Sequence, residues 1–155
     1  NEASFAWTPK TNYDRPSTDS PYSGAGFLNL LDPELASVIG AVDKQVARNT
    51  VTDGGGQDLF SDKVFLLSRA EVYGGTEGNT TGEKPYPYYA SFASSPVSGE
   101  LAGRIKLLNG SLRYWWLRSP YVSNSLHVCS VSTYGGLNIS DAYYALGVSP
   151  ACVII

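Results

Sequence analysis

The only histidine of this 155-residue chain, His127, lies two residues before Cys129. Side chains two apart on a strand point to the same face of a sheet, so the imidazole and the thiol are expected to be neighbours. A thiol beside a base is the pattern of a cysteine nucleophile, and Asp141 supplies a further polar group. The alternative is an ordinary histidine at a surface or an interface. We favour this alternative.

The sequence predicts neither a metal site nor a phosphate-binding loop. The histidine–cysteine pair would need two further ligands at suitable spacing, and none is found. Gly54-Gly55-Gly56 lacks the Lys-Ser/Thr that follows in a P-loop, so we interpret it as a turn. The acids around it lack the ligand register and terminal Glu of an EF-hand loop. These acids are Asp53, Asp58 and Asp62. We therefore expect no metal and no cofactor.

The chain has two cysteines, Cys129 and Cys152. A disulfide between them would close a short loop, but two cysteines do not make a disulfide framework. The other possibility is that both are free and buried, acting as small hydrophobic residues, and we favour it.

Charge nearly disappears from the chain after Arg118-Ser119-Pro120. The last 35 residues contain one formally charged side chain, Asp141, whereas residues 1–120 contain 24. Tyr, Ser, Asn and Gly take the place of Lys and Glu, and these residue types are enriched in surfaces that bind other molecules. We therefore predict a binding surface in this segment. The expected solvent-facing contact residues are Tyr121, Ser123, Asn124, Ser125, His127, Ser132, Tyr134, Asn138, Ser140, Asp141, Tyr143 and Tyr144.

The bulk composition excludes several classes of partner. A net charge of −3 and dispersed basic residues argue against a nucleic-acid partner. No apolar stretch approaches the roughly 20 residues needed to cross a bilayer, so we expect no membrane insertion. The length favours one domain. Because the sequence begins at Asn1 rather than Met, we interpret it either as a piece of a longer chain, which could carry upstream domains, or as a chain processed at its start.

The elements that would hold these residues are short. Residues 1–26 are predicted to be an irregular lead-in. Asp32-Pro33-Glu34 then supplies an N-cap and a first-turn proline, and the apolar spacing that follows predicts a helix over about 33–41. Residues 42–51 could be partly strand. Residues 63–67 are typical of a buried strand, and Ser68-Arg69-Ala70-Glu71 is a capping box.

The second half is predicted to contain short strands and turns. Residues 74–100 form a long irregular stretch, and 104–107 a short element before the Asn109-Gly110 turn. Strands are expected over 114–118, over 126–134 before the Gly135-Gly136 hairpin signal, and within 147–155. The fold class is therefore α+β, with early helices, a mainly antiparallel sheet and abundant loops.

Three residues are predicted to form the scaffold of the binding surface. Trp115 and Trp116 place one ring on each face of a strand, one in the core and the other under the binding surface. The guanidinium of Arg118 is expected to bind several backbone carbonyls. The apolar residues expected beneath the contact residues are Val122, Val128, Val131, Ile139 and Val148.

Three blocks of this sequence together resemble a known family. They are residues 27–31 with the following helix, residues 63–68 with Glu71-Val72, and Trp115-Trp116-Leu117-Arg118-Ser119-Pro120 with the closing residues 147–151. These blocks resemble C-type-lectin-fold domains of the branch related to formylglycine-generating enzymes, common in gut bacteria and their phages. A fixed WWLRSP block before a Tyr/Ser/Asn-rich terminus resembles the variable proteins of diversity-generating retroelements. The resemblance implies a C-type-lectin-like domain over 27–155 with a variable region at about 121–147.

The resemblance also implies a restricted amino-acid alphabet. In that family an error-prone reverse transcriptase randomises template adenines, mostly in AAY codons, which cannot then yield Lys, Glu, Gln, Trp or Met. Residues 121–147 contain none of these five types, whereas residues 1–120 contain 16 of them. At the same frequency, 27 residues would hold between three and four.

The function that the resemblance implies is binding without catalysis. We expect a display domain of a phage tail or a bacterial surface protein that binds a protein or glycan target on a cell surface. The alternative is a fixed-sequence lectin or adhesin domain of the same fold. Ser149 stands where the family usually has Arg, and the cysteine arrangement of formylglycine-generating enzymes has no counterpart. The calcium-dependent sugar motifs of animal lectins are also missing.

Overall fold

The computed structural model describes residues 27–75, 83–91 and 102–155, so the expected lead-in over residues 1–26 lies outside the described part. The described chain is α+β with mostly β content, and its helices are short and its sheets small. It divides into two compact units, which are described separately. In the described ranges no helix has the length and apolarity needed to cross a bilayer.

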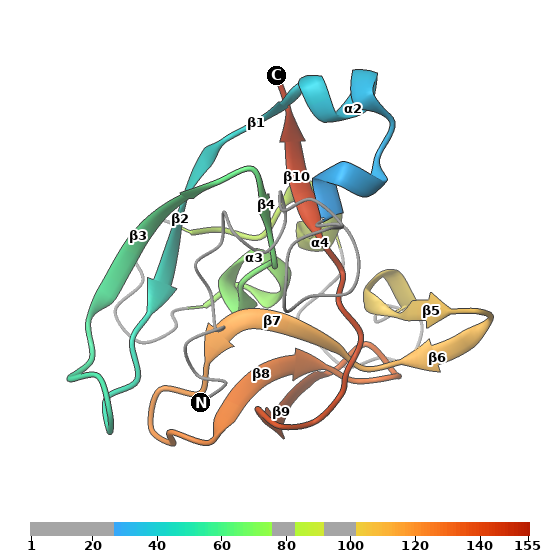
Figure 1. Ribbon diagram of the computed structural model, residues 1–155. Helices are drawn as coiled ribbons and strands as arrows, with labels where there is room; N and C mark the ends of the chain where they lie inside the picture. Colours follow the sequence, from blue (N-terminus) through green and yellow to red (C-terminus); the bar gives the residue numbers. More distant parts are fainter. Residues whose placement is uncertain (1–26, 76–82, 92–101) are drawn as a thin grey trace. The chain divides into compact units, whose positions relative to one another are not determined.

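The first unit contains residues 27–44, 60–65 and 150–155 of the described chain. Its sheet has three antiparallel strands, with β10 (Ala151–Ile154) between β1 (Ile39–Gly40) and β4 (Val64–Phe65), as Figure 1 shows. A 3₁₀ helix over Phe27–Leu30 precedes α2 (Pro33–Ser37). The expected strands over 63–67 and 147–155 are thus present but shorter than the sequence predicts.

Helix α2 begins where the sequence predicts and ends four residues early. The carboxylate of Asp32 accepts a hydrogen bond from the backbone N–H of Glu34 at 2.9 Å, and Pro33 occupies the first turn. The prediction was wrong for residues 38–41, because Ile39 pairs with Ile154 of β10. Strand pairing over the buried Ile39 side chain overrides the helical spacing.

Strands β2 (Val42–Ala47) and β3 (Gln57–Asp62) pair in a two-stranded sheet. The first of them confirms the partly strand interpretation of residues 42–51. The turn between them contains Gly54, Gly55 and Gly56, all at positive φ, a conformation that glycine adopts without strain. The sequence did not predict β3, because its first five residues are exposed and carry no apolar alternation.

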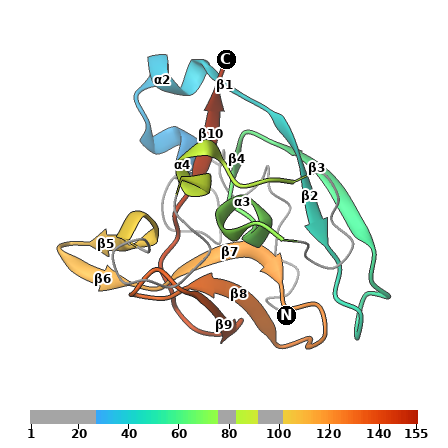
Figure 2. The same cartoon turned by 180° about the vertical axis from the view of Figure 1, so that it is seen from behind.

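The second unit contains residues 45–59, 66–75, 83–91 and 102–149 of the described chain. Its main sheet has the order β7 (Trp115–Pro120), β8 (His127–Val131) and β9 (Leu137–Asp141), all antiparallel. Helix α3 (Arg69–Tyr73) lies against β7 in both Figure 1 and Figure 2. The strands expected over 114–118 and 126–134 correspond to β7 and β8.

The predicted capping box is confirmed at the start of α3. The Ser68 hydroxyl accepts from the Glu71 N–H at 3.1 Å, while the Glu71 carboxylate accepts from the Ser68 N–H at 2.9 Å. The expected irregular stretch over 74–100 contains a helical turn, α4 (Pro87–Ala90), which begins with a proline. Residues 76–82 and 92–101 of that stretch lie outside the described residues.

A short hairpin precedes the main sheet. Strands β5 (Lys106–Leu108) and β6 (Ser111–Arg113) are joined by Asn109 and Gly110, at φ of 51° and 76°. Two consecutive central residues at positive φ are what a type I′ hairpin turn requires, so the Asn-Gly prediction is confirmed.

The core of the second unit forms around Trp115, which is 1% exposed. The indole Nε1 donates a hydrogen bond to the carbonyl of Arg104 at 2.9 Å, and Leu117, Val72 and Val131 are buried nearby in the sheet and α3. Side chains of β7 alternate between buried and half-buried, which leaves Trp116 half-buried on the other face. The one-ring-per-face prediction is therefore confirmed.

Candidate functional site

Four of the tyrosines expected to make contacts lie in loops that follow β7, β8 and β9. Tyr121 is 37% exposed, Tyr134 74%, Tyr143 76% and Tyr144 51%. Tyr121 precedes β8 and Tyr143 and Tyr144 follow β9, whereas Tyr134 lies in the turn between these strands. In an antiparallel hairpin of five-residue strands the two ends are about 17 Å apart. The structure therefore places the expected contact residues at both ends of the hairpin.

The loop before β8 is held in place by Asn49. The buried carboxamide donates to the carbonyls of Tyr121 and Asn124 at 3.1 and 2.9 Å, and its oxygen accepts from the N–H groups of Val51 and Thr52. The adjacent Thr50 donates from its backbone N–H and its hydroxyl to the carbonyl of residue 122. Asn49 was missed by sequence reasoning, since more than 70 residues separate it from this loop.

Two of the expected contact residues shape their own loops. The Asn124 side-chain oxygen accepts from the N–H of Leu126 at 2.9 Å. The Ser132 hydroxyl accepts from the N–H groups of Tyr134 and Gly136 at 3.3 and 3.1 Å. Such side-chain contacts stabilise turns. Ser123 and Ser125, by contrast, are exposed.

His127 and Asp141 are cross-strand partners on β8 and β9. The His127 Nε2 lies 3.0 Å from an Asp141 carboxylate oxygen, with both side chains partly exposed. Cys129 lies on the same face, as its spacing predicts, but it is buried and its thiol approaches the carbonyl of Pro120 at 3.9 Å. The imidazole of His127 thus lies against Asp141, and the thiol of Cys129 lies against the carbonyl of Pro120.

The expectation that Ser140 faces solvent was wrong. Ser140 is 8% exposed and its hydroxyl lies 3.0 Å from that of Ser130, which is fully buried. The Asn138 side-chain nitrogen donates to both hydroxyls, at 2.9 and 3.2 Å. The register Trp116↔Ser130↔Asn138 places these side chains on one face of the sheet. Polar groups on this face satisfy one another, which removes Ser140 from the solvent.

Two of the five apolar residues expected beneath the contact residues are exposed instead. Val131 is fully buried, and Val122 and Val128 are half-buried. Ile139 is 42% exposed and Val148 is 65% exposed, so the prediction that they lie beneath the contact residues was wrong. Ile139 belongs to an outer strand, and Val148 follows the point where the chain leaves the sheet.

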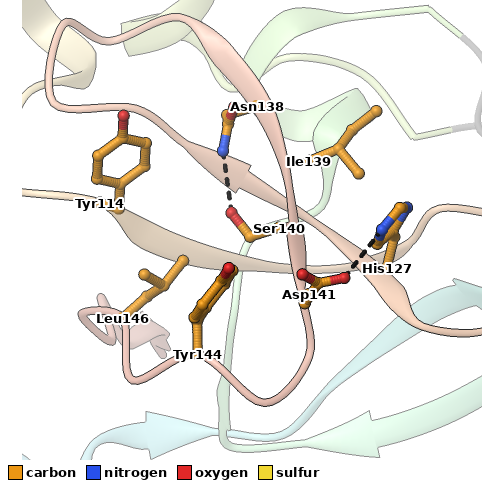
Figure 3. A pocket seen from close by; sticks show the side chains of 8 residues that line it. All are labelled: Tyr114, His127, Asn138, Ile139, Ser140, Asp141, Tyr144 and Leu146. Carbon is orange, nitrogen blue, oxygen red and sulfur yellow. Dashed lines mark hydrogen bonds and ion pairs between the residues drawn. The ribbon is translucent and has the colours of Figure 1, made fainter.

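A shallow hollow of about 440 Å³ opens beside β9. Figure 3 shows Tyr114, Tyr144, Asn138 and Ser140 on one side of the strand and Ile139 and His127 on the other. Its lining residues are Tyr114, His127, Asn138, Ile139, Ser140, Asp141, Tyr144 and Leu146. The hollow therefore combines aromatic rings, amide and hydroxyl groups, and one carboxylate. Five of the twelve expected contact residues meet there.

The exposed Tyr143 belongs to the polar cluster around Asp141. The pKa of Tyr143 is raised to about 12, because its hydroxyl forms hydrogen bonds with Tyr144 and Asp141 and lies near the negative charge of the Asp141 carboxylate. Asp141 thus lies 3.0 Å from the His127 imidazole and also contacts the Tyr143 hydroxyl. The phenol remains protonated and able to donate a hydrogen bond at neutral pH.

Arg118 fixes the sheet from inside the unit. Its guanidinium donates to the carbonyls of Gln45 and Leu66 at 3.0 and 2.7 Å, as the sequence predicts. It also pairs with Glu71 at 2.6 Å and with Glu83. All three charged side chains are nearly buried. Glu83 was not anticipated, because nothing in its loop sequence indicates burial.

The sequence predicts no metal site and favours two free, buried cysteines. Within 27–75, 83–91 and 102–155, no group of three or more His, Cys, Asp or Glu side chains is placed to hold a metal ion. Both cysteines are free; Cys129 is buried, but Cys152 is exposed, which corrects the expectation that both are buried.

Fold and site together define an α+β domain whose sheet is fixed by buried polar contacts and whose exposed loops carry tyrosine, serine and asparagine. The chain belongs to the family described as Domain of unknown function (DUF6273), which matches residues 8–155. Neither the curated proteins nor the solved structures contain a significant match to this sequence.

Proposed function

We propose that this chain is a non-enzymatic binding module with a C-type lectin fold, displayed on a phage tail or a bacterial surface. Its binding surface is formed by residues of the segment 121–147 and is diversified by a retroelement. Its target is a protein or glycan on a cell surface.

The observation that carries this proposal is the exposure of the tyrosines on a fixed frame. Tyr121, Tyr134, Tyr143 and Tyr144 are 37–76% exposed. Tyrosine offers rigid apolar area and a hydroxyl at low entropic cost, which suits contact with a partner. The Asn49 side chain holds the loop that carries Tyr121, and the Ser132 hydroxyl holds the turn that carries Tyr134. The exposed tyrosine side chains can therefore be exchanged there without disturbing the buried residues.

The sequence alphabet supports the retroelement part of the proposal. Residues 121–147 lack all five amino-acid types that adenine randomisation of AAY codons cannot yield. The same segment runs from the end of β7 to the loop before β10, and so contains the loops that carry the four exposed tyrosines. The WWLRSP block, which carries the family resemblance, forms the adjacent strand β7.

Sequencing the locus in sibling genomes tests the origin of the surface. We expect a reverse-transcriptase gene and a template repeat nearby, with substitutions between siblings confined to residues 121–147. Residues 27–120 of the same chains serve as the internal control. An invariant 121–147 segment without a reverse transcriptase would contradict diversification and favour a fixed-sequence adhesin.

Alanine substitution tests the binding role itself. The labelled domain would be incubated with a panel of gut bacterial cells and binding measured by flow cytometry. We expect Tyr121→Ala, Tyr143→Ala and Tyr144→Ala to abolish the binding that the wild type shows. Tyr88→Ala is the matched control, because Tyr88 is 58% exposed but lies on α4. Equal losses in all four variants would contradict the proposal.

A further inference from the structure

Two backbone hydrogen bonds, one at each end of the β8–β9 ladder, show which cross-strand pairs are hydrogen-bonded. The N–H of Ser132 donates to the carbonyl of Gly136 at 2.8 Å, and the N–H of Ala142 donates to the carbonyl of Leu126 at 2.9 Å. Both pairs lie in the register of the two strands. Hydrogen-bonded and non-hydrogen-bonded pairs alternate along an antiparallel ladder, so these two bonds set the phase for every residue between them.

This phase determines which backbone groups of β9 face outward. Asn138 and Ser140 occupy the hydrogen-bonded pairs, so their N–H and C=O groups face β8. The N–H and C=O groups of Leu137, Ile139 and Asp141 therefore point away from β8. Because β9 is the outer strand of the sheet, no strand within the described ranges pairs with this edge.

The opposite edge of the same sheet is covered. The N–H of Trp116 donates to the carbonyl of Gly147 at 3.0 Å, and the N–H of Arg118 donates to the carbonyl of Leu67 at 2.9 Å. Gly147 in turn donates to the carbonyl of Tyr114 at 2.8 Å. Within the described ranges the edge of β7 is thus bonded, whereas at the edge of β9 the carbonyl of Asp141 accepts from the N–H of Tyr144 at 3.0 Å and no strand pairs with the outward groups of Ile139.

The open edge also lacks the usual protection against pairing. Proteins commonly protect an edge strand with Lys, with Pro or with a bulge. Strand β9 reads Leu-Asn-Ile-Ser-Asp, pairs with β8 without a register shift, and exposes Leu137 and Ile139 by about two fifths. An unprotected, partly apolar edge is suited to accepting another strand.

The hollow beside β9 is continuous with this edge. Four consecutive residues, 138–141, line it, and consecutive strand residues point to opposite faces. Figure 3 shows their side chains on both sides of the strand, so the strand edge itself borders the hollow. Its volume lies within the range of binding pockets, about 300–1,000 Å³. Neither Lys nor Arg lines it, and Asp141 supplies the only carboxylate.

We propose that β9 binds an extended segment of a target protein by accepting it as a fourth strand. The inference rests on the binding function proposed above and specifies a protein rather than a glycan as its target. Backbone hydrogen bonds from the N–H and C=O of Ile139 and from the N–H of Asp141 supply affinity that is independent of the peptide's sequence. Alternate peptide side chains lie over Leu137 and Ile139 or enter the hollow beside Tyr144. A Lys or Arg of the peptide pairs with Asp141.

Synthetic peptides test this mode of binding. Linear peptides would be selected on the protein from a random display library and then made with N-methyl groups at alternate residues. Methylating the set of amides that faces β9 should weaken binding about tenfold or more, whereas methylating the intervening set should leave it unchanged. Equal effects of the two sets would overturn the proposal.

Substitutions on the protein supply a second test with the same peptides. Ile139→Pro removes one outward N–H and leaves the ladder to β8 intact, so we expect about tenfold weaker binding. Ile139→Ala keeps the N–H and should weaken binding less. If Ile139→Pro fails to fold, the N-methyl series on the wild type decides the question. Wild-type affinity of a folded Ile139→Pro variant would overturn the proposal.

Other occupants of the edge give distinct results. If methyl glycosides of common hexoses shift the NMR resonances of Asn138 and Tyr144 and no peptide is selected, the ligand at this edge is a glycan rather than a peptide. If the wild type sediments as a dimer and the Ile139→Pro variant as a monomer, the strand that occupies this edge comes from a second copy of this chain. Either result overturns strand addition, while the display function is still decided by the substitution pattern at residues 121–147.

Discussion

The two edges of the β7–β8–β9 sheet differ in how their polar groups are satisfied. At β7, backbone N–H groups bond to Gly147 and Leu67, and the Arg118 guanidinium lies among carbonyls and two carboxylates. At β9, the outward backbone groups border an open hollow, and the nearby tyrosines are exposed. One edge is therefore fixed by internal contacts, and the other has groups available for a partner.

This difference shows how a binding surface can change without loss of the fold. Buried polar groups are costly to leave unpaired, so residues at the β7 edge depend on one another. Exposed side chains at β9 and its loops contribute little to stability, so they can be replaced one by one.

The largest effect is expected at Arg118. Arg118→Ala leaves the Glu71 and Glu83 carboxylates nearly buried without their cation, which should lower the free energy of unfolding by about 3–5 kcal/mol. Denaturant unfolding measures it. Arg48→Ala is the control, because its pair with Asp58 at 3.9 Å is exposed and should contribute less than about 1 kcal/mol. Similar losses in both variants would contradict the contrast.

A smaller effect is expected at Asn49, which joins the fixed part of the chain to the exposed loop. Asn49→Asp removes the donors to the carbonyls of Tyr121 and Asn124 but keeps the oxygen that accepts from Val51 and Thr52. We expect a loss of about 1–3 kcal/mol. Hydrogen exchange should accelerate in residues 121–126 and stay unchanged in α3. Faster exchange throughout the unit would mean that Asn49 supports the whole sheet.

Removing single tyrosine hydroxyls compares an inner tyrosine with an exposed one. The Tyr73 hydroxyl donates to the carbonyl of Gly135 at 2.7 Å, and burial raises the pKa of Tyr73. Tyr73→Phe should therefore cost about 1 kcal/mol in thermal or denaturant unfolding. Tyr134→Phe should change stability by less than about 0.5 kcal/mol. A larger cost for Tyr134→Phe would show that the exposed ring supports the fold.

The smallest effect concerns the ionisation of Tyr143. Its pKa is about 12 in the folded protein against the ordinary 10.0, so the folded state favours the neutral phenol. The corresponding stabilisation is present below pH 10.0 and is lost as the pH rises towards 12. Tyr144→Phe removes the main hydrogen-bond partner and should lower the pKa of Tyr143 in an ultraviolet titration. An unchanged titration would exclude this hydrogen bond as the cause.

Sequence reasoning identified elements whose signals are local. The Asp32-Pro33 start of α2, the Ser68–Glu71 capping box and the Asn109-Gly110 turn each depend on neighbouring residues, and each is present. The end of α2 could not be predicted, because Ile39 is drawn into a strand by Ile154, more than 100 residues away.

By itself, the sequence determined the α+β class, the two faces of the tryptophan pair, the carbonyl-binding role of Arg118 and the concentration of tyrosine after β7. These follow from local spacing and from composition, which every stretch of chain carries within itself. Only the tertiary structure decided that Ser140 is buried, that Asn49 holds the loop before β8, and that β9 rather than β7 has an open edge. The reason is physical: hydrogen-bond phase, burial and edge coverage depend on contacts between residues distant in the chain.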